Sequence, residues 1–158
     1  AYLPLLEQLR EQGYDIVLVK MPFNLAFFDM NAAEDVLDNM DEELPEVKNW
    51  YIMGHSLGGV AASSFAADES DSIAGLILLG AYGYGKYDES NTLIAYGSND
   101  VKLDLDKIHE DKSKVVEIDG GNHAWFGNYG EQDGDGEATI SHREQQDITT
   151  ETISQWLS

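Results

Sequence analysis

The sequence WYIMGHSLGGVAAS at residues 50–63 decides the fold. Its apolar first part predicts a strand over residues 49–53, and its small apolar last part predicts a helix that packs closely on a sheet. Ser56 lies between them in the pattern G-x-S-x-G, a sharp turn that strains the serine backbone and raises its hydroxyl above the strand end. We expect the N–H of Leu57 and the start of the helix to point at the same spot, where they would stabilise a developing oxyanion.

Short apolar runs alternate with helical patterns along the rest of the chain, which is the arrangement of βαβ units. It predicts the α/β fold class, as a three-layer α/β/α sandwich around a mostly parallel sheet. No internal repeat or linker divides the sequence, so we expect a single domain over residues 1–158. Further strands are predicted at residues 15–20, 73–79, 92–96 and 115–118, and helices at residues 2–9, 33–40, 60–67, 103–109 and 148–157. Helix ends are predicted at Gly13 and at two capping pairs, Asn31 with Glu34 and Ser141 with Glu144.

Polar side chains follow two of the predicted strands. Asp100 closes the turn GSND after one strand, and His123 lies in a glycine-containing loop after the last strand. Because the carboxyl ends of parallel strands meet at one edge of a sheet, we expect both to lie near Ser56. A serine hydroxyl needs a base to take its proton, and the base needs a carboxylate to orient it. We therefore predict Ser56 as a nucleophile, His123 as its base and Asp100 as the acid.

The other histidines and two further acids fit these roles less well. His55 lies beside the serine inside the turn and is expected to pack or to line the cleft. His109 lies among acidic residues on a predicted helix, and His142 lies in the first turn of the last helix. Asp88 and Asp119 remain as alternative acids, but neither follows a buried strand at the right point in the chain.

The run GHSLGG at residues 54–59 resembles the nucleophile elbow of the α/β-hydrolase superfamily, and the order serine, aspartate, histidine is the order of the triad in that family. The stretches VKMPFNLAFF at residues 19–28 and GNHAWFG at residues 121–127 are similar to its small, dienelactone-hydrolase-like branch. The resemblance extends over essentially the whole chain. True dienelactone hydrolases use a cysteine nucleophile, which this chain lacks, so the resemblance implies a serine enzyme instead.

The resemblance also implies that the front of the domain is missing. In that family a central strand, and the loop that supplies the second oxyanion donor, precede the first long helix, which begins here at about Tyr2. Without that strand, the strands at residues 15–20 and 49–53 would face each other with unpaired edges. We therefore expect an N-terminally truncated fragment of a longer protein, with any targeting segment upstream of Ala1, so that the sequence does not indicate the compartment.

The function implied by the resemblance is hydrolysis of carboxylic esters or thioesters through an acyl-enzyme. Peptide or amide cleavage by the same three residues, and a non-catalytic binding protein on the same fold, remain as alternatives. The ten residues 81–90 leave no room for the helical lid of many relatives, so we expect an open site. Imidazole and aromatic side chains expected to bind substrate there are His55, Phe23, Tyr82 and Trp125.

The composition excludes several other classes of function. The chain has 30 Asp and Glu against 9 Lys and Arg, a formal net charge of −21, which repels nucleic acid and anionic lipid. It has no cysteine, which excludes a disulfide framework and Cys-ligated zinc. We find no signal peptide and no apolar run long enough to span a bilayer. The expected partner is a small ester-type molecule, with no cofactor and no metal.

The segment GEQDGDGE at residues 130–137 superficially suggests a calcium loop. Counted from Asp133, however, the sixth position of the EF-hand pattern holds Ala138, where a glycine is needed. Glu144 does occupy the twelfth position, but no flanking helix pair is predicted. We therefore expect a flexible acidic surface loop.

Overall fold

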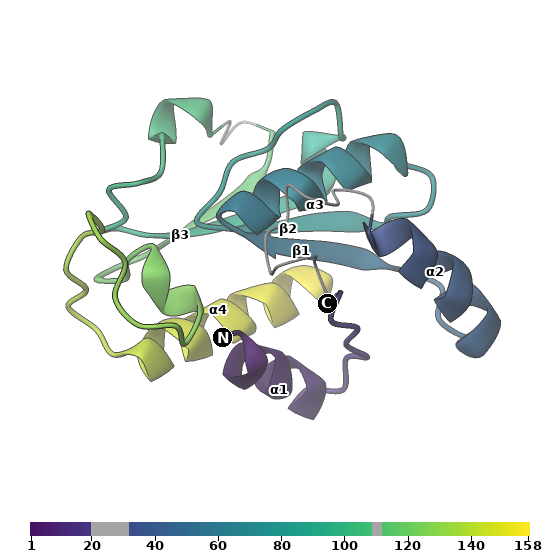
Figure 1. Cartoon of the computed structure of the whole chain (residues 1–158), viewed down its shortest axis with the longest axis horizontal. Coiled ribbons are helices and arrows are strands. Elements are labelled where there is room, and N and C mark those ends of the chain that lie inside the picture. Colours follow the sequence, from purple (N-terminus) through teal and green to yellow (C-terminus); the bar gives the residue numbers. More distant parts are fainter. Residues whose placement is uncertain (20–31, 109–111) are drawn as a thin grey trace.

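The computed structural model describes residues 1–19, 32–108 and 112–158, and within them four strands form one parallel sheet (Figure 1). Every residue of the two central strands is buried, which explains their nearly continuous apolar sequences. The strands lie in the order β1 (Tyr51–His55), β2 (Gly75–Leu79), β3 (Thr92–Gly97) and β4 (Lys114–Ile118).

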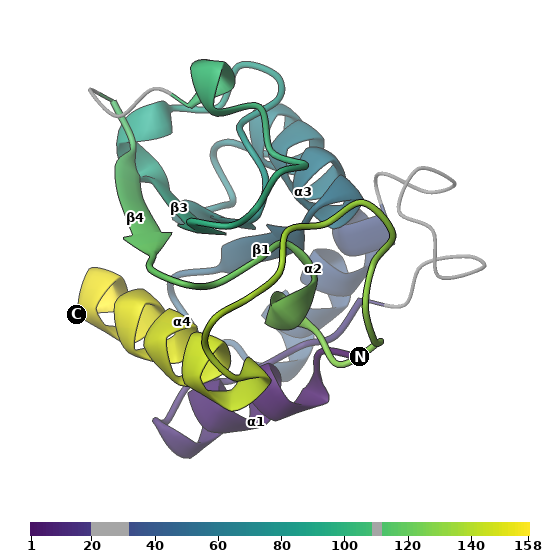
Figure 2. The ribbon, with the colours of Figure 1, turned by 90° about the vertical axis from the view of Figure 1, so that its left-hand side faces the viewer.

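Helices cover both faces of this sheet (Figures 1 and 2). On one face lie α1 (Leu3–Glu11) and α4 (His142–Leu157), which also pack on each other. On the other face lies α3 (Leu57–Asp68), and α2 (Ala32–Glu43) contributes Ala33 to the same core. The predicted α/β fold with three layers is therefore confirmed.

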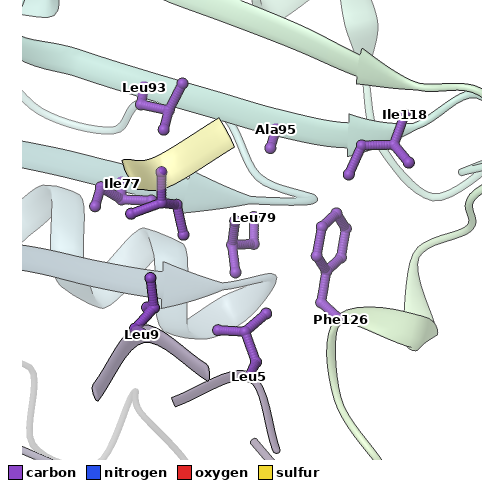
Figure 3. Packing of buried hydrophobic residues seen from close by; sticks show 9 residues of the cluster. Leu5, Leu9, Ile77, Leu79, Leu93, Ala95, Ile118 and Phe126 are labelled. Carbon is purple, nitrogen blue, oxygen red and sulfur yellow. The ribbon is translucent and has the colours of Figure 1, made fainter. Parts of the chain in front are cut away.

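Each face of the sheet has its own apolar core. Alternate residues of β2 serve the two cores, because successive strand side chains point to opposite faces. A fully buried Leu, Ile or Phe side chain contributes roughly 1.5–3 kcal/mol to folding. Figure 3 shows the core beneath α1 and α4, with Leu5, Leu9, Ile77, Leu79, Leu93, Ala95, Ile118 and Phe126. Ile153 of α4 completes it.

The parallel register brings the functional segments of the chain to one edge. The ends of β1 and β2 are in register, and so are the ends of β3 and β4. The segments that leave these four ends carry Ser56, Gly80, Asp100 and His123. This edge therefore places residues from four distant parts of the sequence next to one another.

The strand predicted at residues 15–20 is wrong over the described residues 15–19, which lie outside every strand. A strand needs a neighbour for its N–H and C=O groups, and no described strand pairs with this segment. Val17 and Leu18 are 38% and 63% exposed, so this apolar run is not buried as a strand inside a sheet would be.

The helix predicted at residues 103–109 is also wrong over its described part. Residues 103–108 contain only a 3-10 turn, Leu105–Lys107. The carboxylate of Asp100 takes two N–H groups just before this turn, and the side chain of Leu105 is half exposed, so no buried apolar face holds a longer helix.

The other predicted strands and helices are present, and two predicted helix ends are confirmed. Gly13 has a φ of 97° after α1, and Ser141 Oγ accepts the Glu144 N–H at 3.2 Å at the start of α4. For the pair predicted at Asn31 and Glu34, Asn31 lies outside the described residues. Within the part of the chain that the structure describes, no helix is long and apolar enough to cross a membrane.

Candidate active site

The turn between β1 and α3 holds Ser56 in an unusual backbone conformation. With φ at 53° and ψ at −122°, it is the only non-glycine residue of positive φ among those described. Such a conformation costs about 1–3 kcal/mol and persists only where the surroundings enforce it. Here the Ser56 N–H donates to the Leu79 carbonyl at 3.0 Å, and the Ser56 carbonyl accepts the Gly59 N–H at 2.9 Å. The serine is therefore anchored to both the sheet and the helix.

Crowding in this turn explains two of its glycines. A Cβ on Gly54 would lie 2.1 Å from the Gly58 carbonyl oxygen, and a Cβ on Gly59 would lie 2.5 Å from the Ala81 side chain. A Cβ on Gly58 would meet nothing within 4 Å. Of these three glycines of the turn, only Gly54 and Gly59 are therefore required by close contacts, and at Gly58 the structure leaves space.

Leu57, the predicted oxyanion donor, is the first residue of α3. The N–H groups of a first helical turn have no partner within the helix, and they lie at the positive end of its dipole. Leu57 follows Ser56 directly, so its N–H lies beside the serine at the helix start. Its side chain is 45% exposed and is available at the surface.

Ser56, His123 and Asp100 form one hydrogen-bonded chain. Ser56 Oγ lies 2.8 Å from His123 Nε2, and His123 Nδ1 lies 2.8 Å from Asp100 Oδ2. Because a carboxylate only accepts hydrogen bonds, Nδ1 carries the proton and Nε2 offers its lone pair to the serine hydroxyl. The side chains of His123 and Asp100 are only 4% and 0% exposed, so this pair is shielded from water.

Two features hold the carboxylate of Asp100 in this position. Its Oδ1 accepts the N–H groups of Lys102 and Leu103 at 2.9 and 3.1 Å, which leaves Oδ2 for the imidazole. Gly80, with a φ of 52°, lies against the pair. A Cβ there would stand 3.1 Å from His123 Nδ1 and 3.2 Å from Asp100 Oδ2, so the bare backbone leaves room for the contact.

A family model described as "Alpha/beta hydrolase family" matches residues 1–147, in agreement with the parallel sheet and the strained serine turn. The chain belongs to the α/β-hydrolase family. The family expected from the sequence is thereby confirmed, whereas its dienelactone-hydrolase-like branch stays a prediction. Comparison with curated proteins finds no match.

In this α/β-hydrolase the loop that carries His123 is fastened by a carboxylate. Asp135 accepts the N–H groups of His123 at 3.2 Å, Ala124 at 2.8 Å and Gly136 at 2.8 Å. Residues 130–137 form a mostly exposed loop, as predicted, but Asp135 is part-buried and is bound to the loop of His123. No group of three or more His, Asp or Glu residues in the described ranges could hold a metal ion.

His55 lies against His123, with 4.9 Å between the ring centroids. Its Nε2 is 2.8 Å from the His123 carbonyl oxygen, and its Nδ1 is 2.8 Å from the Tyr2 hydroxyl. Burial, followed by the charge of His123, lowers the pKa of His55 to about 4, so the ring is neutral at neutral pH. The sequence suggested a substrate-binding role for His55, but both of its nitrogens have partners inside the protein.

The other predicted substrate-binding residues are placed as follows. Tyr82 lies just beyond the end of β2, and its hydroxyl accepts a hydrogen bond from Lys107 Nζ at 3.1 Å. The Trp125 ring stacks on His142 of α4 at a centroid distance of 4.1 Å. Phe23 lies outside the described residues. Substrate binding by these three residues stays a prediction.

The alternative acids and bases lie elsewhere. The carboxylate of Asp88 accepts the Ser90 N–H at the start of a 3-10 turn (Glu89–Asn91), and Asp119 is exposed. His142 is in the first turn of α4, as expected, and His109 lies outside the described residues. The structure brings neither described acid to His123, which Asp100 contacts instead.

Proposed function

We propose that this chain is a serine hydrolase that cleaves carboxylic esters or thioesters through an acyl-enzyme. The observation that carries the proposal is the pair of 2.8 Å hydrogen bonds that link Ser56 to His123 and His123 to Asp100. A nucleophile, a base and an orienting acid in this order are what acyl transfer requires. The strained backbone of Ser56 supports the proposal further, because such costly conformations cluster at active sites.

In the first half of the reaction, Ser56 Oγ attacks the carbonyl carbon and its proton passes to His123 Nε2. The negative oxygen of the tetrahedral intermediate accepts the Leu57 N–H at the positive end of α3. Asp100 keeps the imidazole in the correct orientation and stabilises its charged form. The bond to the leaving alcohol or thiol then breaks, and that group takes the proton from His123.

In the second half, water replaces the leaving group. His123 Nε2 removes a proton from the water as its oxygen attacks the acyl carbon. The ester bond to Ser56 Oγ breaks, the serine recovers its proton from His123, and the carboxylic acid departs. The same three residues thus serve both halves, and the enzyme returns to its starting state.

The neighbours of the cluster favour an apolar acyl group. Leu57 follows Ser56 directly, Val101 follows Asp100 directly, and their side chains are 45% and 68% exposed. Exposed apolar side chains beside reactive groups gain free energy when an apolar substrate covers them. The net charge of −21 disfavours anionic substrates, because it repels them before they reach the site.

Peptide or amide cleavage uses the same residues, and a non-catalytic binding protein would keep the fold without an activated serine. Two measurements separate these alternatives. A panel of p-nitrophenyl esters, thioesters and p-nitroanilides with one common acyl group distinguishes ester from amide cleavage. A fluorophosphonate, which reacts covalently only with activated serines, distinguishes an enzyme from a binding protein.

The labelling experiment compares the parent with Ser56→Ala and Ser70→Ala. Ser70 is an exposed serine outside the cluster and serves as a matched control. We expect the parent and Ser70→Ala to be labelled at neutral pH and Ser56→Ala to remain unlabelled. A folded parent that stays unlabelled would refute the proposal and leave the binding function.

A further inference from the structure

We propose that His55 is a positioning residue for His123. The His55 ring donates a hydrogen bond to the main-chain carbonyl of His123, and the Tyr2 hydroxyl holds the other nitrogen of the same ring. The inference rests on the proposed function, in which His123 is the base. It assigns a role to two residues that form no hydrogen bond with the serine hydroxyl or with Asp100 among the described residues.

The direction of each hydrogen bond follows from the chemistry of its partners. The His123 carbonyl oxygen can only accept, so the His55 Nε2, 2.8 Å away, must carry the proton. A neutral imidazole then has a lone pair on Nδ1, which accepts the Tyr2 hydroxyl proton at 2.8 Å. The series of hydrogen bonds therefore runs from the Tyr2 O–H through the His55 ring to the His123 backbone. Only one tautomer of His55 satisfies both contacts.

The surroundings keep this arrangement in one protonation state. Burial raises the pKa of Tyr2, so its hydroxyl keeps the proton that it donates. Burial and His123 lower the pKa of His55 to about 4, whereas Asp100 acts in the opposite direction. The Tyr129 ring also packs against both Tyr2 and His55, with centroids 6.2 Å from each. Across the pH range in which an imidazole base works, His55 remains a neutral donor.

The carbonyl that His55 contacts belongs to His123, the proposed base, so its position affects the reaction. His123 Nε2 must stay within hydrogen-bonding reach of Ser56 Oγ, and a displacement of about 1 Å can cost on the order of 100-fold in rate. Asp135 already holds the N–H of the same residue. With His55 on the carbonyl, side chains hold both polar groups of the His123 backbone, so the backbone that carries the imidazole cannot shift along the sheet edge without breaking one of these hydrogen bonds.

The test measures the rate of fluorophosphonate labelling between pH 5 and 10 in four variants that are folded by circular dichroism. His55→Phe removes the donor but keeps a ring, whereas His55→Gln keeps a donor at a similar distance. Tyr2→Phe removes only the hydroxyl, and Tyr14→Phe makes the same change on a tyrosine that packs against the core beneath α1 and α4, outside this series of hydrogen bonds. The pH profile reports the base, which a purely structural loss of stability does not alter.

We expect His55→Phe to slow labelling by about 100-fold and to change the pH profile, and His55→Gln to recover most of the rate. Tyr2→Phe should lie between the parent and His55→Phe, and Tyr14→Phe should match the parent. If folded His55→Phe reacts at the parent rate with the parent profile, His55 only packs and the inference is wrong. If the parent itself does not react, the proposed function fails instead.

A second measurement does not depend on activity or on the folding of His55→Phe. Long-range proton–nitrogen NMR correlations of the histidine rings identify which nitrogen carries the proton. In the parent we expect His55 to be protonated on Nε2 alone at pH 7. In Tyr2→Phe the same tautomer should persist, because the His123 carbonyl is unchanged, while the Nδ1 signal shifts as that nitrogen loses its donor. A parent ring protonated on Nδ1 would overturn the inference, because its Nε2 could not then donate to the carbonyl.

Discussion

The side chain of Gln145 pairs with the backbone of Asn122 through two hydrogen bonds. Its Oε1 accepts the Asn122 N–H at 3.0 Å, and its Nε2 donates to the Asn122 carbonyl at 2.8 Å. Gln145 lies on α4 and is fully buried, whereas Asn122 precedes His123 in the loop after β4. A helix side chain thus acts as the neighbouring strand would in a sheet, and it ties the base to the helix layer beneath.

Gln145→Glu should therefore destabilise the protein in a pH-dependent way. An ionised Glu cannot donate to the Asn122 carbonyl, so at pH 7 we expect a loss of about 3 kcal/mol in the free energy of unfolding. Burial raises the pKa of such a carboxyl, so the loss shrinks as the pH falls through the raised pKa, and it is smallest below about 4.3, the ordinary pKa of Glu, where the carboxyl is neutral in both states. Urea unfolding at pH 7 and pH 4.5 measures this decrease.

The matched control is Gln155→Glu, on the exposed side of the same helix. There the new charge faces Glu151 across one helical turn at the surface, so we expect a cost of roughly 0.5 kcal/mol or less. Equal losses in the two variants would show that the pairing with Asn122 contributes nothing particular to stability.

Local patterns were sufficient to predict the fold and the cluster. The buried runs of β2 and β3 are contiguous in sequence, and parallel strands necessarily bring their carboxyl ends to one edge. For this reason the order of Ser56, Asp100 and His123 predicted which side chains would meet, and the structure places them within hydrogen-bonding distance. The strand expected at residues 15–20 is absent over the described residues 15–19, because a strand needs a partner, which an apolar run alone does not reveal.

The supporting residues could not be predicted in the same way. Gln145 and Asp135 are polar, and a polar residue on a helix or in an acidic loop ordinarily faces water. Tyr2 follows the apolar spacing of α1, which predicts packing and not a hydrogen bond. Each acts through a partner far away in sequence, so only the folded arrangement reveals it. Of the glycines near Asp135, Gly136 is the one that lies against backbone, since a Cβ there would meet the Asn99 carbonyl.

Asp100→Asn should slow ester hydrolysis by about 10⁴-fold with little change in stability. An amide at this position can donate to Nδ1 and so favour the wrong tautomer of His123, which then has no lone pair for the serine. The measurement is kcat for a p-nitrophenyl ester, with thermal unfolding as the check on folding. Asp88→Asn and Asp119→Asn make the same change at the two alternative acids and should keep the parent rate. If either of these slows the reaction while Asp100→Asn does not, the acid is misassigned.

His55 should make the protein less stable below pH 6.5. Its pKa is lowered to about 4, with burial as the largest cause and His123 as the next, against 6.5 in the unfolded chain. As the pH falls, the unfolded state binds the proton first, so the free energy of unfolding declines between pH 6.5 and 4. The full contribution of this residue is about 3 kcal/mol.

Urea unfolding at pH 7 and pH 4 in the parent and in His55→Gln tests this expectation. Protonation of carboxylates on this acidic chain acts on both proteins alike, so the difference between them isolates His55. His55→Gln should lose less stability than the parent on acidification. Parallel pH dependences of the parent and His55→Gln would contradict the lowered pKa.

Asp135→Ala should loosen the loop that carries His123. The change leaves the N–H groups of His123, Ala124 and Gly136 without their acceptor, and we expect a loss of about 2 kcal/mol together with slower fluorophosphonate labelling. Asp133→Ala removes an exposed carboxylate from the same acidic segment and should change neither quantity. A similar effect of both variants would attribute the change to surface charge and not to these hydrogen bonds.

Gly54→Ala should be far more harmful than Gly58→Ala, although both glycines belong to the same motif. At Gly54 the new Cβ would lie 2.1 Å from the Gly58 carbonyl oxygen and 2.6 Å from the Gly59 nitrogen, and backbone atoms cannot move aside as a flexible side chain can. The turn would have to open, at a cost of about 3 kcal/mol or more, and Ser56 would lose its position. At Gly58 the Cβ meets open space inside α3, where alanine stabilises a helix by roughly 0.5–1 kcal/mol over glycine. In thermal unfolding, Gly54→Ala should therefore be less stable than the parent and Gly58→Ala more stable. In fluorophosphonate labelling, only Gly54→Ala should lose the label. A stable, labelled Gly54→Ala would show that the turn is not as tight as the contacts require.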